Sequence, residues 1–396
     1  MSEMSTAVTA PVPLRGRAGA GVSDRDTAVS RFEAVSRFER LPNPSPSPEG
    51  EGSRKRSTAG TAPSRLESRW LRGTAFLGTR TAIMAGAMTW VSERHLVSAI
   101  SNAGGFGVIA CGSMTPALLD AEIAATKLLT AQPFGVNLIT LHPLLHELIA
   151  VCANHRVGHV VLAGGLPPGG AIEAIKASGA KLMCFAPVPA IAKKLVRAGI
   201  DALIIEGSEA GGHIGPVSTS VLAQEILPVI DAVPVFVAGG IGRGAAIAAY
   251  LEMGASGVQL GTRFAAATES VAHANFKRAF IRAAARDAVA SVQLDPRLPV
   301  IPVRALKNAG SEAFAAKQRE VALRIDAGTI DLASGQLEIE HYWAGALRRA
   351  VVDGDVETGS VMAGQSVGMV TAEQPVAAII AELIAEAEAA LSARAA

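Results

Sequence analysis

Short apolar runs alternate with stretches of helical period along the chain from about Trp70 onward. The runs that predict strands are 81–88, 106–111, 134–139, 159–163, 181–185, 202–206, 233–238 and 257–260. Several of the stretches between them end in glycine, a residue that commonly ends a helix. Strands joined through a helix pair in parallel. The pattern therefore predicts an α/β fold, and its eight repeats predict a closed (β/α)8 TIM barrel.

An open, doubly wound sheet is the competing fold. Its dinucleotide-binding fingerprint spaces three glycines as G-x-G-x-x-G after a strand. Here Gly240, Gly242 and Gly244 are spaced as G-x-G-x-G, and they follow the seventh apolar run. No acidic residue ends a following strand, so the barrel is the favoured prediction.

The chain divides by composition into a leading segment and a long alternating segment. Residues 41–50 are rich in proline and serine, and 54–56 are basic, so little there can form a core. A targeting peptide is the alternative, but the segment carries acidic residues and lacks an apolar signal core. We predict four parts: 1–65, a disordered extension; 66–264, the barrel; 265–345, a mainly helical cap; and 346–396, a segment that returns to the barrel.

Composition and charge argue against several classes of function. The formal net charge is +1, which does not steer the protein toward nucleic acid or an anionic membrane. No apolar run reaches the length of about 18 residues that a membrane-spanning helix needs. The three cysteines, Cys111, Cys152 and Cys184, are odd in number and far apart, which argues against a disulfide framework and a zinc site. We expect buried thiols, no metal and a cytoplasmic protein, and we leave a homodimer open.

The stretch 206–215 carries the strongest candidate for chemistry. It follows the apolar run 202–205, so a buried strand is expected to end where its glycines begin. Gly211 and Gly212 let the backbone turn sharply and approach a flat ligand. His213 comes next, and a histidine there can transfer a proton or donate a hydrogen bond near neutral pH. A surface turn with an incidental histidine is the alternative.

Two further strand ends carry glycines. The seventh and eighth runs end in Gly239-Gly240 and Gly261-Thr262. Phosphate groups usually dock after these two strands in a (β/α)8 barrel, where backbone N–H groups and helix N-termini favour an anion. The pattern predicts a phosphorylated cofactor, and glycines that serve only tight turns are the alternative.

Two amide side chains stand at strand positions that are otherwise apolar. Asn137 lies near the end of the third run, and Gln259 lies within the eighth. An amide is both donor and acceptor, which suits the edge of a heteroaromatic ring such as a flavin. The alternative, which stays open, is that each amide bonds to backbone inside the barrel.

Seven motifs together resemble the nitronate monooxygenase family, formerly called 2-nitropropane dioxygenases. They are 84–91, 102–105, 134–137, 206–215, 238–241, 259–264 and 362–365. The same motifs occur in the related flavin-dependent enoyl-acyl-carrier-protein reductases. The resemblance covers about residues 70–390 and implies an FMN-binding barrel.

The resemblance also implies roles for particular residues. His213 matches the active-site histidine of the family. The residues that match FMN contacts of the family are Asn137, Glu206, Gly211, Gly212, Gly239, Gly240, Gln259, Leu260, Gly261 and Thr262. The last two glycine turns among them would hold the phosphate. The residues expected along the isoalloxazine ring are Ala85, Gly86, Ala87 and Met88.

The activity implied first is oxidation of an alkyl nitronate by O2 to a carbonyl compound and nitrite, with His213 positioning the anion. The alternative is reduction of an enoyl thioester by NAD(P)H through FMN. Many monooxygenases of the family carry Gln where this chain has Glu206, and 302–308 and 354–365 look closer to the reductases. A third hypothesis, a flavin-binding protein without turnover, is disfavoured by His213 beside a ring-binding loop.

Overall fold

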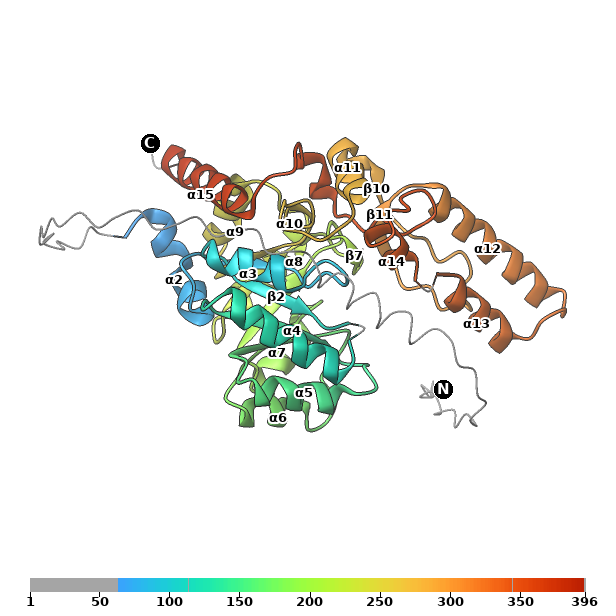
Figure 1. Ribbon diagram of the computed structural model, residues 1–396, viewed down its shortest axis with the longest axis horizontal. Coiled ribbons are helices and arrows are strands. Elements are labelled where there is room, and N and C mark those ends of the chain that lie inside the picture. The colour runs from blue at the N-terminus through green and yellow to red at the C-terminus, as the bar shows by residue number, and fades with distance from the viewer. Residues whose placement is uncertain (1–62, 113, 344, 395–396) are drawn as a thin grey trace, which may run out of the picture. The chain divides into compact units, whose positions relative to one another are not determined.

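The structure is a computed structural model that describes residues 63–112, 114–343 and 345–394 (Figure 1). Residues 1–62 of the predicted extension, 1–65, lie outside the described residues. The central feature is an eight-stranded parallel sheet in the order β1-β9-β8-β6-β5-β4-β3-β2. Its strands are β1 Ile83–Ala85, β2 Gly107–Ala110, β3 Phe134–Ile139, β4 His159–Ala163, β5 Lys181–Phe185, β6 Ala202–Glu206, β8 Val235–Ala238 and β9 Gly257–Leu260.

The sheet closes between β1 and the start of β2. β1 pairs with β9 on one side. On the other side Ala85 N donates to Phe106 O (2.8 Å), and Phe106 N donates to Ile83 O (2.9 Å). The two edges of the sheet therefore meet, and the prediction of a (β/α)8 barrel is confirmed.

All eight strands fall within the predicted apolar runs, because strands buried on both faces read as continuous apolar sequence. The largest difference is β1, which has three residues although the run 81–88 is longer. The backbone leaves the sheet after Ala85 and turns. Ser92 Oγ donates to Gly86 O (3.0 Å) and accepts from Met88 N (3.0 Å), which holds that turn.

Helices alternate with the strands. They are α3 Arg94–Asn102, α4 Pro116–Leu129, α5 Leu145–Asn154, α6 Ala171–Ala177, α7 Pro189–Arg197, α8 Thr219–Ile226, α9 Gly244–Glu252 and α10 Thr262–Ala265. One helix was not anticipated from the sequence: α2, Arg65–Leu77, precedes β1. Ser64 and Glu67 form a capping box at its start, and Gly78 ends it in the left-handed conformation (φ 73°).

Helix α15, Val376–Ala393, packs against α9 and α2 (Figure 1). Its buried face carries Ile379, Ile380 and Leu383. The approach to α9 is close, because a Cβ on Gly244 would lie 2.0 Å from Leu383 O. The last part of the chain thus packs on the helix that follows the Gly239-Gly240 turn.

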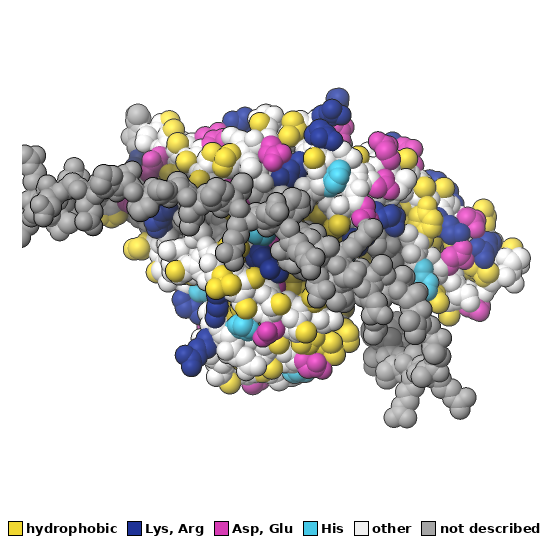
Figure 2. Space-filling view, in the orientation of Figure 1, with side chains coloured by type: hydrophobic (Ala, Val, Ile, Leu, Met, Phe, Trp, Pro, Cys, Tyr) yellow, Lys and Arg dark blue, Asp and Glu magenta, His cyan; other side chains and the backbone are white. Residues whose placement is uncertain are grey.

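The segment after α10 contains α11 Ala274–Arg282, β10 Ala288–Ala290, β11 Val303–Leu306, α12 Ala309–Asp326, α13 Leu332–Trp343 and α14 Ala346–Val351. It has a small core of its own, formed by Leu298, Val300, Phe314, Val321 and Ile339. Figure 2 shows basic and acidic side chains intermingled at the right-hand end of the view, and pairs such as Lys317–Glu338 (2.6 Å) join α12 to α13.

The helical expectation for this segment missed a small antiparallel sheet. β10 pairs with β11, and β11 pairs with β7, Gly212–His213, from the loop after β6. The strands are too short, and too interrupted by prolines, for their apolar pattern to stand out. This sheet links the segment directly to the candidate histidine, while the proposed domain boundaries stay a prediction.

None of the helices in the described ranges is long and apolar enough to cross a membrane. The same residues hold no group of three His, Cys, Asp or Glu side chains placed to bind a metal ion.

Candidate active site

The carboxyl ends of the first and last barrel strands form one surface. A Cβ on Gly86 would lie 3.7 Å from Gln259 Nε2 and 3.7 Å from Gly261 Cα. A Cβ on Gly261 would in turn lie 3.5 Å from Met88 Sδ. The structure therefore brings the predicted ring-contact residues, 85–88, against the predicted contacts at 259–262.

The loops after β6 and β8 interlock beside this surface. The carboxylate of Glu209 accepts from Thr219 N (2.8 Å) and from Thr219 Oγ1 (2.9 Å), which fixes the loop to the start of α8. Gly239 and Gly240 both adopt positive φ (97° and 72°), and a Cβ on Gly240 would lie 2.9 Å from Glu209 Cβ. Glycine is thus required at 240 by both backbone conformation and space. Glu209 and Thr219 were not assigned to the site from the sequence.

The glycine turns leave hydrogen-bond donors free. Among the described residues, no acceptor takes the backbone N–H of Gly239, Gly240 or Gly261. Backbone donors of this kind at adjacent strand ends are the usual means by which such barrels hold a phosphate.

The segment 362–365 forms another side of the site. Gly364 N donates to Thr262 Oγ1 (3.0 Å), and Gln365 N donates to Glu209 O (2.9 Å). A Cβ on Gly211 would lie 2.6 Å from Gly364 N, so this contact also requires glycine. The sequence resemblance included this segment but gave it no site role, because its place beside the barrel comes only from the folded chain.

Asn137 and Gln259 are the buried side-chain amides of the site. They are 5% and 7% exposed, and neither side-chain amide makes a hydrogen bond with another described residue. Buried amides in proteins are normally satisfied. The alternative that both bond to backbone inside the barrel does not hold for these residues, and both stay available to a ligand.

Glu206 and His213 are the titratable residues among the predicted site residues. Glu206 ends β6, and burial raises the pKa of its carboxyl to about 7. His213 lies in β7 opposite Val303 and is exposed. The protein around His213 still removes enough water to lower the pKa of the imidazole below its ordinary value. Near pH 7 the imidazole is therefore neutral, and the carboxyl is close to its midpoint.

Arg304 in β11 ties the cap to this loop. Its Nε donates to Ser208 O (2.8 Å), and its Nη1 donates to Ala288 O (2.5 Å). The guanidinium thus holds the backbone two residues beyond Glu206 in place. The stretch 302–308 contributed to the resemblance to the reductases. Only the pairing of β11 with β7, however, indicates the role of this arginine.

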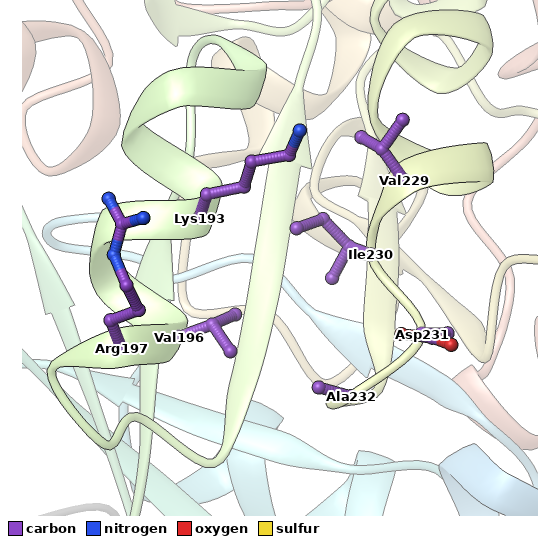
Figure 3. Close-up of a pocket in the computed structure, with 7 residues that line it drawn as sticks. All are labelled: Lys193, Val196, Arg197, Val229, Ile230, Asp231 and Ala232. Atoms are coloured by element: carbon purple, nitrogen blue, oxygen red, sulfur yellow. The ribbon is translucent and has the colours of Figure 1, made fainter.

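Other cavities lie away from this surface. One of about 210 Å³ lies between α7 and the 3-10 turn Leu227–Val229, outside the barrel, where Lys193 extends toward Val229 and Ile230 (Figure 3). It contains none of the candidate site residues.

The residues at the carboxyl end of the barrel fit FMN. Glycine turns with free N–H groups suit a phosphate, and unpaired buried amides suit the polar edge of a flat ring. The barrel therefore has, at one end, the groups that a bound flavin nucleotide would require.

The family follows from comparison with known proteins. Residues 72–386 match the family model described as nitronate monooxygenase, and the chain belongs to this family. Members of the family generally depend on a flavin. The protein is therefore an oxidoreductase enzyme.

Particular relatives differ in the activity that their names state. A (3aS,4S,5R,7aS)-5-hydroxy-7a-methyl-1-oxo-octahydro-1H-indene-4-carboxyl-CoA dehydrogenase of Rhodococcus jostii is 35% identical over 56% of this chain, but only 62% of that relative is covered. A nitronate monooxygenase of Paraburkholderia phytofirmans is 27% identical over 68% of this chain and 87% of its own. The structure of FabK from Thermotoga maritima is similar with a TM-score of 0.72 and 34% identity, covering 84% of this chain and 98% of that one.

Proposed function

We propose that this enzyme binds FMN and oxidises alkyl nitronates with O2 to carbonyl compounds and nitrite. The observation that carries the proposal is the convergence of the glycine turns, the unpaired Asn137 and Gln259, and His213 at one end of the barrel. The family match supports the choice of reaction. When bound, FMN would accept electrons from the substrate and pass them to oxygen.

The residues of the site would hold the cofactor and position the substrate. Gly239, Gly240 and Gly261 would hold the phosphate through backbone N–H groups, and Asn137 and Gln259 would orient the ring. Neutral His213 would donate a hydrogen bond to a nitronate oxygen and hold the anion above the ring. This requires no proton transfer from His213.

A second candidate is NAD(P)H-dependent reduction of an enoyl thioester. It is favoured by the 34% identity to FabK across nearly all of that chain, and by Glu206 in place of the glutamine of many monooxygenases. A carboxyl with a pKa near 7 can hold a proton beside the ring, which a glutamine cannot deliver.

Two substrates added to separate samples distinguish these functions. FMN-loaded enzyme is given propyl-2-nitronate in air, and nitrite and acetone are measured. We expect both products to appear together without NADH. A second, anaerobic sample receives NADH and then an enoyl thioester. Rapid loss of the flavin colour with NADH, its return with the thioester, and no nitrite in the first sample would establish the reductase instead. Failure to retain FMN would contradict both.

A further inference from the structure

A second cavity, of about 570 Å³, lies at the amino end of the barrel. Its wall includes the end of α2 and the first residues of three strands: Leu77, Phe134, His159 and Lys181. Because the barrel strands are parallel, this end is opposite the glycine turns. Its volume lies within the range of sites that bind small molecules, about 300–1,000 Å³.

The cavity is lined by positive charge alone. Lys127, Arg156 and Lys181 contribute to its wall, and no carboxylate does. The acidic side chains nearby already have partners: Asp120 contacts His155 Nε2 (2.8 Å), and Asp201 pairs with Lys176 (2.5 Å). Uncompensated positive charge in a concave wall favours an anion.

Lys127 and Lys181 are held by hydrogen bonds to backbone carbonyls and still have unused donors. Lys127 Nζ donates to His155 O, and Lys181 Nζ donates to Phe76 O and lies 4.9 Å from the centre of the Phe76 ring. An ammonium group has three donors. Each lysine therefore keeps hydrogen-bonding capacity for a ligand while its position is fixed.

Arg156 occupies a backbone position that does not suit it. Its φ is +50°, in the left-handed region, at the turn that follows α5. Glycine is the usual residue after a helix at such a position. Within the described residues its guanidinium forms no ion pair. The exposed guanidinium of Arg156 therefore has charge and donors available to a ligand.

His159 is the second unusual group in the wall. It is 6% exposed, and its Nε2 bonds to Phe76 O (2.9 Å), so Nε2 carries the proton and Nδ1 is an acceptor. Nδ1 has no partner in the part of the chain that the structure describes. Burial, aided by the charge of Lys181, lowers the pKa of His159 to about 4.

We propose that this cavity is a binding site for a small organic anion, a phosphate ester or a carboxylate, distinct from the flavin site and formed by Lys127, Arg156 and Lys181. The site does not depend on the proposed function. An anion there neutralises the field that Lys181 exerts on His159, which gives the site its own spectroscopic probe.

Calorimetric titration with two probes tests the site. Pyrophosphate and citrate are each added at constant ionic strength to FMN-loaded protein from which free FMN has been removed by gel filtration, so that the glycine turns are occupied and no free phosphate ester competes. We expect millimolar or tighter binding by wild type. Lys127→Gln with Arg156→Gly is expected to weaken it at least tenfold, although glycine suits position 156 and should preserve or raise the melting temperature. The tighter probe identifies the chemical class of the ligand.

A matched double variant controls for charge. Lys193→Gln with Arg197→Gln removes the same charge from the cavity in Figure 3, whose wall also contains Asp231, and is expected to bind as wild type does. The pKa of His159, followed by NMR of its labelled ring carbon, should rise with the probe in wild type and in this control only. No binding by wild type, or binding by Lys127→Gln with Arg156→Gly within tenfold of it, would overturn the proposal.

Discussion

The two ends of this barrel are built differently from the same strands. At the amino end the interior is filled by rings: Phe76 and Phe106 contact His159 edge-on, with centres 5.3 and 4.9 Å from it. At the carboxyl end, glycine turns and unpaired amides replace packed rings. The difference separates packing around the strand starts from the flavin chemistry proposed at the strand ends, because a surface that holds a flat ring cannot also be filled by the protein's own side chains.

Phe106→Ala should show the largest effect, and on stability alone. Phe106 is fully buried at the amino end. Its truncation should lower the free energy of unfolding by about 3–5 kcal/mol. FMN affinity and kcat of the folded fraction should stay within about threefold, since independent sites rarely couple. Chemical denaturation and turnover at 15 °C measure the two quantities. A large fall in FMN affinity would show that the two ends are coupled.

His213→Ala should lower activity and leave stability almost unchanged. His213 is exposed, so the free energy of unfolding should change by less than about 0.5 kcal/mol. Loss of its hydrogen bond to the substrate should lower turnover about 100-fold. Flavin absorbance after gel filtration checks that the cofactor is retained. Unchanged turnover would remove the catalytic role assigned to His213, and His213→Asn, which keeps a donor, should recover part of the activity.

Two glycine substitutions compare the ends directly. Gly240 and Gly254 both have positive φ (72° and 105°), but a Cβ on Gly240 meets Glu209, whereas one on Gly254 meets nothing within 4 Å. Valine at either position should cost about 1–2 kcal/mol of stability through backbone strain, and Gly240→Val should cost more because its side chain also meets Glu209. Gly240→Val alone should weaken FMN binding, at least about tenfold. Equal losses of FMN in both variants, measured by fluorescence titration, would mean that general destabilisation explains the effect.

The barrel was predictable from the sequence, and much of the surroundings of the site was not. Buried parallel strands such as β2 and β8 appear as uninterrupted apolar runs, so their bounds are visible locally. The glycines at the strand ends and His213 are also visible in the sequence, because they follow such apolar runs. The pairing of β7 with β11, and the contact of Thr262 with Gly364, join residues about 90 to 100 positions apart. Such contacts leave no local pattern, and the role of Arg304 depends on them.

Glu206→Gln should act through the pH dependence of stability. Because the folded pKa of Glu206 is raised from 4.5 to about 7, the unfolded chain binds fewer protons between these values, and wild type loses stability as pH rises through that window. Glutamine does not titrate. The unfolding free energy of FMN-free Glu206→Gln minus that of wild type should therefore increase from pH 4.5 to pH 7 and then level off. Taking this difference removes the contribution of Glu93, whose pKa burial also raises to about 7. A flat difference measured by urea denaturation would mean that Glu206 is ionised normally, and that the carboxyl end is as well hydrated as an ordinary surface.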